Sequence, residues 1–415
     1  MSGRLVRPDF LSGNPMSTAA SPAHSRWLLP ALALLSAVAP LATDMYLPSL
    51  PQMASELGST AAGVQLTLTA FLAGLGCGQF VIGPLSDALG RRRPLLAGTA
   101  LCLLASVLCA LSDRLELLVA ARFLQGFAGA AGVVLARAII ADISTGAEIA
   151  RRMSLMMVIG GVAPVLAPTL GGLVAEQAGW RAVLWVLVGL VALMCLSVVV
   201  VVRETLPPAS RRRGGLRVLL ANGRQVLQRR RYIGYGLTVV AAFGSLFAYI
   251  AASPFVLQNV VGLSPTVYAV VFGANAAALI LANVVNARLV SRVAPERMLR
   301  TGIVALVACT AVLLGLVLVP DPPAWPVLLL LWLSLASLGL VFGNASALAL
   351  SQVRDLAGTG SAFLGSLQFL GGALVAPVVG LAGEADARPM ALAMFTAAVL
   401  AALSLFLIAG RAPSH

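Results

Sequence analysis

Long apolar runs, separated by short polar or charged breaks, dominate the 415-residue chain. Twelve such runs lie at 27–47, 64–84, 94–111, 115–141, 153–174, 182–202, 233–261, 267–287, 301–319, 326–350, 361–381 and 390–409. Each is close to the roughly 20 residues that a helix needs to cross a bilayer. Membrane-spanning strands would instead alternate apolar and polar residues. The pattern predicts an all-α membrane protein with twelve transmembrane helices.

The longest hydrophilic break, 204–231, divides these runs into two sets of six. We expect an amino-terminal six-helix bundle over 27–203 and a carboxyl-terminal six-helix bundle over 232–410, joined by a basic cytoplasmic linker. Segment 1–26 is rich in Ser, Pro and Gly and is predicted to be a disordered tail, and 411–415 is a short second tail. Two parallel repeats of this kind place a cavity between the halves near the middle of the membrane.

Composition and charge add an orientation to this picture. Hydrophobic residues make up 60% of the chain, charged residues only 10%, and the 28 basic residues are all arginines. Most arginines lie in the breaks on one side of the membrane, whereas the breaks on the other side hold Arg114, Arg181 and Arg388. Because cytoplasmic loops are enriched in arginine, we expect both termini in the cytoplasm and the protein in the bacterial inner membrane. Arginines placed in this way form no continuous basic face, so nucleic acid is not expected as a partner.

Cysteine and histidine usage argues against metal and redox chemistry. The five cysteines lie inside apolar runs, their number is odd, and they show no metal-ligand spacing. The two histidines, His24 and His415, lie in the tails. A membrane enzyme would need clustered His, Cys or carboxylate side chains, which the sequence lacks. We therefore expect no enzyme, no metal and no cofactor.

Charged residues inside the apolar runs are costly and mark function by default. The last six runs contain none, whereas the first six contain Asp44, Arg122 and Arg137, with Asp87 and Asp142 at helix ends. Asp44 and Arg122 each lie roughly 10 Å below the same membrane surface, at 1.5 Å per helical residue. If their helices adjoin, the two can pair or compete for a proton, because burial disfavours a carboxylate and a nearby cation favours it. Proton coupling is the hypothesis, and a permanent structural ion pair is the alternative.

A specific motif follows the second run. Gly83, Asp87, Gly90 and the arginines at 91–93 give the spacing GxxxDxxGRRR. The glycines permit a tight turn and close helix approach, and Asp87 can cap the amino terminus of a neighbouring helix. This segment resembles the signature loop between helices 2 and 3 of the major facilitator superfamily.

Further segments extend the resemblance from about residue 27 to 410. Arg122, Gln125 and Gly126 resemble the helix 4 motif of that family. Segment 161–172 resembles the helix 5 motif of that family, which is characteristic of antiporters. The matching residues are Gly161, Pro164, Pro168, Gly171 and Gly172, and Ala167 stands where the family usually has glycine. Segments 41–51, 283–290 and 361–369 are similar to the Bcr/CflA subfamily of drug:proton antiporters.

The resemblance implies a role for each matching residue. Asp44 would be the protonatable acid of helix 1, and Arg122 the helix 4 arginine linked to proton transfer. Gly171 and Gly172 would let helix 5 pack against the other half. The resemblance further implies that the protein works as a monomer.

A cytoplasmic gate is also implied by the resemblance. Its residues would be Gly83, Asp87, Gly90, Arg91, Arg137 and Asp142. Asp87 would lie near 358–361, and Asp142 would join the gate through Arg137 or one of the arginines at 91–93.

Polar and aromatic residues within the runs are candidates for a substrate cavity. They are Tyr46, Gln65, Tyr249, Asn275, Asn344, Gln368 and Phe369. A drug pocket is mostly apolar with a few polar groups that fix orientation. The alternative for each of them is a hydrogen bond between helices.

The favoured function is proton-coupled efflux of small, mostly apolar drug-like molecules across the bilayer, by rocking of the two bundles. Its only driving force would be the proton gradient. The alternative within transport is export of a metabolite such as an amino acid or nucleoside. A channel, the other alternative, would show flux that does not depend on the gradient.

Overall fold

The computed structural model describes residues 27–145, 147–211, 215–320, 322–380 and 386–410. Within these ranges the secondary structure is entirely helical. The first part comprises α1 (Leu28–Ser36), α2 (Val38–Asp44), the 3₁₀ turn η1 (Leu47–Ser49), α3 (Leu50–Glu56), α4 (Ala61–Leu89), α5 (Arg92–Leu111), α6 (Leu115–Ile143), α7 (Ala147–Val201), the 3₁₀ turn η2 (Pro208–Ser210) and α8 (Gly215–Gln228). The second part comprises α9 (Arg230–Phe255), the π-helical turn η3 (Val256–Val260), α10 (Pro265–Leu289), α11 (Pro295–Val317), α12 (Ala324–Ser351), the 3₁₀ turn η4 (Arg354–Leu356), α13 (Ala357–Gly380), α14 (Arg388–Leu403) and the π-helical turn η5 (Ser404–Ala409).

Eleven helical stretches in the described residues are long and apolar enough to cross a membrane. One of them, Val162–Val201, contains Gly179, whose φ of 78° breaks the helical backbone. Only glycine adopts this conformation at little cost. Two of the expected runs, 153–174 and 182–202, therefore form the two arms of α7. The prediction of an all-α membrane fold is confirmed.

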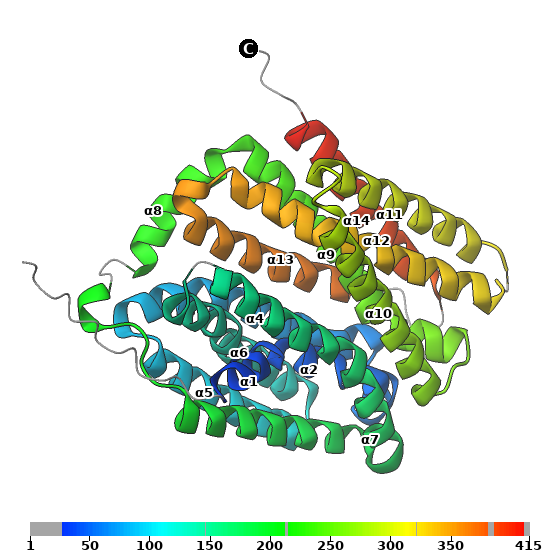
Figure 1. Ribbon diagram of the computed structural model, residues 1–415. Helices are drawn as coiled ribbons and strands as arrows, with labels where there is room; N and C mark the ends of the chain where they lie inside the picture. The colour runs from blue at the N-terminus through cyan, green and yellow to red at the C-terminus, as the bar shows by residue number, and fades with distance from the viewer. Residues whose placement is uncertain (1–26, 146, 212–214, 321, 381–385, 411–415) are drawn as a thin grey trace, which may run out of the picture.

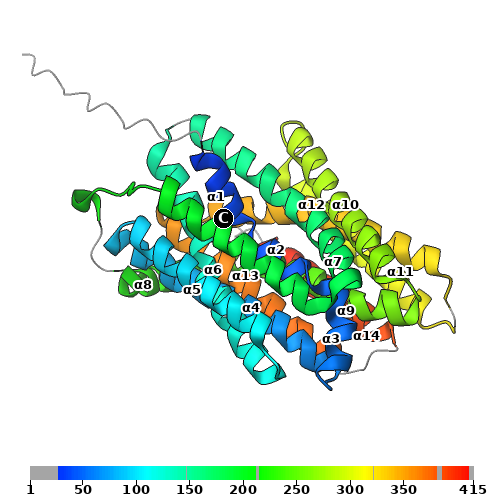
Figure 2. The same ribbon diagram turned by 90° about the horizontal axis from the view of Figure 1, so that it is seen from below.

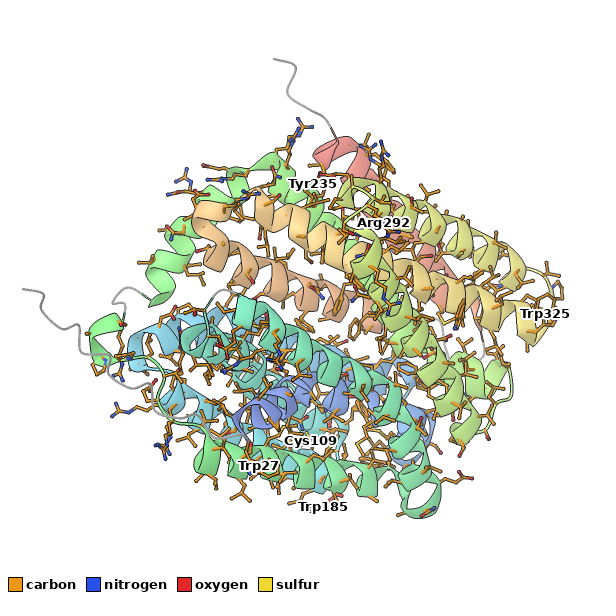
Figure 3. All side chains as sticks on the ribbon, in the orientation of Figure 1. Trp27, Cys109, Trp185, Tyr235, Arg292 and Trp325 are labelled. Atoms are coloured by element: carbon orange, nitrogen blue, oxygen red, sulfur yellow. The ribbon has the colours of Figure 1, made fainter. Side chains whose placement is uncertain are left out.

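Large apolar side chains cover much of the outer surface of these helices. Leu374, Val200 and Trp325 are 74%, 72% and 69% exposed in the isolated chain. Trp185 and Trp325 lie at the edge of the molecule (Figure 3). Such a surface is compatible with hydrocarbon rather than water, because exposed apolar area of this extent is rare on soluble monomers.

The first expected span, 27–47, is not one continuous helix. The α-helix is interrupted by a turn at Ala37, where ψ is −8°, and again after Asp44, where ψ of Tyr46 is −4°. Two prolines follow closely, at positions 48 and 51. A proline cannot donate a backbone hydrogen bond, so regular helix is hard to maintain across this segment. Asp44 consequently ends a short helix within the membrane.

The helices pack into two groups, seen below and above each other in Figure 1. Helices α1–α7 form the amino-terminal half, in which α4, α5 and α7 pack around α6 and α1. Helices α9–α14 form the carboxyl-terminal half, in which α9 contacts α12, α13 and α14. Contacts between the halves run mainly through the pairs α4–α13 and α7–α10. The segment expected as a linker contains α8, which lies at one end of the molecule beside α4 and α13 (Figures 1 and 2).

The two ends of the molecule differ in how the halves meet. We call the end that carries residues 91–93, 203–211 and 288–300 the arginine-rich face. Among the described residues, three hydrogen bonds join the halves near the opposite face. Gln65 Nε2 donates to the carbonyl of Ala251 (2.9 Å), Gln258 Nε2 donates to the carbonyl of Pro48 (3.1 Å), and Thr266 donates to Glu176. Near the arginine-rich face the halves instead enclose a cavity of about 890 Å³.

Candidate functional site

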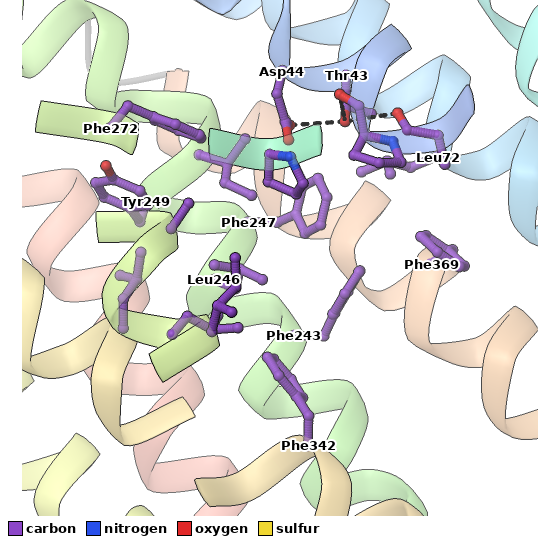
Figure 4. A pocket seen from close by; sticks show the side chains of 18 of the residues that line it. Thr43, Asp44, Leu72, Phe243, Leu246, Phe247, Tyr249, Phe272, Phe342 and Phe369 are labelled. Atoms are coloured by element: carbon purple, nitrogen blue, oxygen red, sulfur yellow. Dashed lines mark hydrogen bonds between the residues drawn. The ribbon is translucent and has the colours of Figure 1, made fainter. Parts of the chain in front are cut away.

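A cavity of about 360 Å³ lies between the two halves, deeper in the molecule than the one at the arginine-rich face. Helices α2, α4 and α7 provide one wall, and α9, α10, α12 and α13 provide the other (Figure 4). Most of its lining is aliphatic or aromatic. The aromatic residues are Phe243, Phe247, Tyr249, Phe272, Phe342 and Phe369. Several of these rings pack edge to face, for example Phe243 against Phe369 with centroids 5.3 Å apart.

Asp44 is the one charged residue among those that line this cavity. It is only 5% exposed, and the Thr43 hydroxyl lies 2.8 Å from its Oδ1 (Figure 4). The break in the first span places the carboxyl at the end of α2, where its side chain faces the cavity. Thr43 and Asn283 supply polar groups to the same lining. The site thus combines one ionisable group with a largely apolar wall.

Arg122 lies nearby in the amino-terminal half and is 1% exposed. Its Nη2 donates to the carbonyl of Ala42 (2.7 Å), and its Nη1 donates to Oε1 of Gln125 (2.7 Å). The guanidinium lies 4.5 Å from the ring centroid of Tyr46 and 4.6 Å from that of Phe71. Cation–π contacts of this kind stabilise a buried cation. Ala42 belongs to the last turn of α2, so Arg122 binds the backbone of the segment that carries Asp44.

Asp44 and Arg122 do not form an ion pair within 4.0 Å among the described residues. The permanent structural bridge considered as the alternative is therefore not seen here. The two helices do adjoin, because Arg122 reaches a carbonyl only two residues before Asp44. The Nε of Arg122 is buried and has no hydrogen-bond partner in the described part of the chain.

Of the seven residues expected in the substrate cavity, Tyr249 and Phe369 line it. The structure places Tyr46 and Gln65 elsewhere. The Tyr46 hydroxyl lies 3.2 Å from Oγ1 of Thr67, and its ring packs on Arg122. Gln65 instead joins the halves near the opposite face.

The remaining three candidates also lie outside the cavity lining. Asn275 donates to the hydroxyl of Tyr249 (2.8 Å), so it orients a residue of the lining without being part of the lining itself. Asn344 donates to Oδ1 of Asn286 (2.7 Å) and links α12 to α10. Gln368 is half-buried on α13. For Asn275 and Asn344 the alternative, a hydrogen bond between helices, describes the structure.

The loop motif forms a charged cluster at the arginine-rich face. Arg91 Nη1 lies 2.6 Å from Asp87 Oδ1, and its Nε lies 2.9 Å from Asp142 Oδ2. Arg91 also donates to the Ser86 hydroxyl (2.7 Å). Gly90 has a φ of 93°, which only glycine adopts readily, and this turn brings Arg91 back toward α4. Asp142 thus pairs with Arg91 rather than with Arg137.

Arg137 faces the larger cavity at this face and has no ion-pair partner among the described residues. Gly83 and Asp87 line the same cavity from α4. Across it lie Gly358 and Ser361 of α13. The motif residues and the start of α13 therefore face one another across the gap between the halves.

Glu204 is a member of the charged cluster that the sequence reasoning missed. Its carboxylate accepts hydrogen bonds from the backbone N–H groups of Arg91 (2.8 Å), Arg92 (3.3 Å), Thr205 (3.1 Å) and Leu206 (3.0 Å). Partial burial raises the pKa of Glu204, but these four donors outweigh it and hold the pKa below its ordinary value. The signal available was an isolated acid immediately after a membrane span, at the start of a basic segment.

The helix 5 motif lies on the first arm of α7. Pro164 lines the central cavity, and Pro168 lies inside the helix one turn further on. A Cβ on Gly171 would collide with the carbonyl oxygen of Met45 in the same half. A Cβ on Gly172 would lie 3.2 Å from Cβ of Ala269 in the other half. Only Gly172 therefore packs across the interface, whereas Gly171 permits close packing against the broken first span.

Comparison with known proteins supplies the family. The Major Facilitator Superfamily model matches residues 32–376. The chain belongs to the Major Facilitator Superfamily. Members of this superfamily are transporters, so the chain is a multi-pass membrane transporter and not an enzyme. The family resemblance found in the loop, helix 4 and helix 5 motifs is confirmed.

Curated relatives and solved structures agree with this assignment. A Bacillus subtilis protein described as an uncharacterized MFS-type transporter, YdgK, is 40% identical over 90% of this chain and 93% of its own. The bicyclomycin resistance protein homolog of Haemophilus influenzae is 29% identical (92% and 95%), and the multidrug resistance protein MdtL of Escherichia fergusonii is 28% identical (86% and 90%). A bacterial homolog of the lysosomal transporter Spinster, in an inward-facing conformation, superposes with a TM-score of 0.73 at 15% identity, covering 95% of this chain and 100% of that one. At that identity the superposition speaks for the fold alone.

Proposed function

We propose that this transporter exports small, mostly apolar drug-like molecules across the bacterial inner membrane in exchange for protons. The observation that carries the proposal is Asp44: one buried carboxyl faces a cavity of about 360 Å³ that is otherwise lined by apolar, aromatic and a few neutral polar groups. A lone carboxyl in such surroundings is a suitable site for binding and releasing a proton, because a permanent charge there is costly. The relatives named for multidrug and bicyclomycin resistance, and the similarity to Bcr/CflA antiporters, support the direction and the substrate class.

Alternating access supplies the transport step in this proposal. The halves are bonded near the opposite face and enclose a cavity of about 890 Å³ near the arginine-rich face, which positive-inside placement assigns to the cytoplasm. A substrate entering from the cytoplasm reaches the aromatic lining, and release outside requires the halves to rock apart near Gln65 and Gln258.

Coupling in this proposal links Asp44 to Arg122. When the cavity is occupied or the halves tilt, Asp44 loses its proton, and the buried Nε of Arg122 is a donor that the carboxylate can accept from. Protonation from outside then resets the carboxyl toward Thr43. Export and proton entry are thereby tied to one side chain.

Proteoliposomes provide the test. With an imposed pH difference and ethidium as the probe, the natural protein should concentrate the dye and dissipate the pH difference. Asp44→Asn should lose both by more than about 100-fold, the scale of a lost proton-transfer group. Asp113→Asn, which changes an exposed acid at the opposite face, is the matched control and should behave normally. Gradient-driven accumulation that survives in Asp44→Asn would refute the coupling assignment.

A growth-inhibition panel separates drug export from metabolite export. In a pump-deficient bacterial host, the natural protein should raise resistance to several apolar antibiotics, and Asp44→Asn should not. Unchanged resistance, together with faster release of an amino acid or nucleoside, would favour the metabolite alternative.

A further inference from the structure

The outer surface of the carboxyl-terminal half contains a groove. It has a volume of about 730 Å³ and lies between α11, α13 and α14, away from the interface between the halves. Consecutive helices α13 and α14 touch over a short stretch only, because α14 packs instead against α9 and α11. Buried Val379 and Ala397 form the floor, and exposed Leu374, Val378 and Leu392 form the walls. The groove is therefore open to the membrane.

The dimensions of this groove fit one leaflet of a bilayer. Along α14 it extends from Arg388 to Leu400, thirteen helical residues whose twelve steps of 1.5 Å span about 18 Å. Half of the hydrocarbon core is about 15 Å thick. A lipid tail lying along α14 would thus place its headgroup beside Arg388, at the mouth of the groove.

Charged groups at the mouth complete the site. Arg388 is one of three arginines on the side that positive-inside placement assigns to the outside, and it lines the groove. Its Nε lies 3.5 Å from the carbonyl of Val317 and 4.0 Å from Oδ1 of Asp386. No contact to its two terminal nitrogens is found within the described residues, so they are available to a phosphate, which guanidinium groups bind in a two-pronged manner. By contrast, Arg181 is engaged by Glu56, Asp113 and the ring of Trp180.

We propose that this groove binds a zwitterionic phospholipid with a primary ammonium headgroup from the outer leaflet. The tail fills the apolar groove, Arg388 binds the phosphate, and Asp386 accepts a hydrogen bond from the ammonium. Asp386 Oδ1 already accepts the backbone N–H of Arg388 (2.8 Å), which fixes the acid beside the arginine and leaves Oδ2 for the ligand. A pair of opposite charges this close matches a zwitterion better than a headgroup with net negative charge. The proposal rests on the membrane fold and the orientation, and not on drug export or proton coupling.

Native mass spectrometry of the full-length protein in detergent tests the proposal. Phosphatidylethanolamine, phosphatidylcholine, phosphatidylglycerol and diacylglycerol with identical acyl chains are the probes. The natural protein should retain phosphatidylethanolamine about fivefold better than diacylglycerol, the scale of one arginine acting on a lipid phosphate. Arg388→Gln should abolish this preference, whereas Arg114→Gln, at another outer arginine, should keep it. The natural protein should also retain phosphatidylethanolamine better than phosphatidylcholine, because Asp386 accepts a hydrogen bond from the primary ammonium. Asp386→Asn should remove only this second preference.

Three results would overturn the assignment. Equal retention of diacylglycerol and phosphatidylethanolamine would show that the headgroup is not bound. An unchanged preference in Arg388→Gln would place the phosphate elsewhere, and a preference for phosphatidylglycerol would reject the zwitterion. Ala393→Phe, which fills the groove without altering the mouth, should lower retention of all four lipids, and size-exclusion elution would verify that each variant is folded.

Discussion

The two halves share an architecture but divide the chemistry between them. The amino-terminal half buries Asp44 and Arg122 inside the membrane, with Arg122 held by four neighbours. The membrane-spanning interior of the carboxyl-terminal half contains no charged residue in its described part, and it contributes all six aromatic rings named above for the central cavity. In the proposed function, the amino-terminal half therefore holds the proton and the carboxyl-terminal half holds the apolar molecule.

This difference has a physical reason. A buried charge needs a fixed set of donors, acceptors or rings around it, which makes its surroundings intolerant of change. An apolar wall needs only shape and area, so it can accept molecules of different structure. If transport works as proposed, placing the two on opposite sides of one cavity lets the apolar wall vary without disturbing the surroundings of Asp44.

Removal of the buried arginine should have the largest effect on this division. Arg122→Met leaves the carbonyl of Ala42 and the amide of Gln125 without their donor, and we expect gradient-driven transport to fall more than about 100-fold. Arg122→Lys keeps the charge but lacks the planar guanidinium that donates to both the Ala42 carbonyl and Gln125 Oε1, so transport by this variant should also be strongly impaired. Dye accumulation in inverted membrane vesicles measures both variants, with the exposed Arg292→Gln as the control. Normal accumulation in Arg122→Met would mean that this cation has no part in coupling.

The neighbouring glycines of α7 provide a sharper test of packing within and between the halves. Gly171→Val drives a side chain into the backbone of Met45 and should cost about 3 kcal/mol or more of stability. In Gly172→Ala the new Cβ lies 3.2 Å from Cβ of Ala269 and 3.4 Å from the carbonyl oxygen of Pro265, so the change should cost less than about 1 kcal/mol. Thermal unfolding in detergent compares the two. Equal losses of stability would contradict the close contact between α7 and the broken first span.

Changes in the aromatic wall should alter recognition and leave coupling intact. Phe243→Leu removes edge-to-face contacts with Phe342 and Phe369, so we expect up to about a tenfold rise in KM for an aromatic probe. The number of protons exchanged per dye molecule should stay the same. Phe123→Leu, on an exposed surface of α6, is the matched control. A changed proton ratio in Phe243→Leu would break the proposed division between the halves.

The smallest effect is expected for a substitution of Glu204, which lies at the edge of the amino-terminal half, and it concerns the pH dependence of stability. Because its folded-state pKa is depressed, its contribution to stability is present above the unfolded-state value of about 4.3 and is lost as the pH falls through the lower folded value. Glu204→Gln should therefore lower the unfolding temperature at pH 7, and the difference from the natural protein should shrink as the pH falls below about 4.3 toward the lower folded pKa. A difference that is constant with pH would show that charge on Glu204 is not what binds the four N–H groups.

Much of this architecture follows from the sequence because lipid imposes strict rules. Apolar length alone located the spans, and the cost of buried charge singled out Asp44 and Arg122. Counting helical residues gave these two a similar depth, and the structure brings Arg122 to the backbone next to Asp44. The loop motif placed Asp87, Arg91 and Asp142 in one gate but left open which arginine would bind Asp142, and the Asp87–Arg91 ion pair was not predicted.

The lining of the cavity could not be predicted in the same way. A helix that is apolar on all sides carries no polar stripe to show which face points inward. Gln65 and Asn344 looked like cavity residues, yet each bonds a neighbouring helix. Phe243 and Phe247, four residues apart, gave a sign of a shared face, but apolar rings occur on lipid-facing surfaces as well. Glu204 was missed because its partners are backbone groups, which a sequence does not display.

Because the first span is interrupted, a small local change in its backbone can reorient Asp44. Each residue that joins or leaves an α-helix rotates the following side chains by about 100°. The break at Ala37 comes before Asp44, so drawing Ala37 into regular helix would turn α2 and redirect the carboxyl of Asp44. Such a change exchanges one or two backbone hydrogen bonds, so its energy is on the scale of a single turn rather than of a six-helix assembly. The direction of the acid thus depends on one turn of helix, which Arg122 of α6 holds through the carbonyl of Ala42.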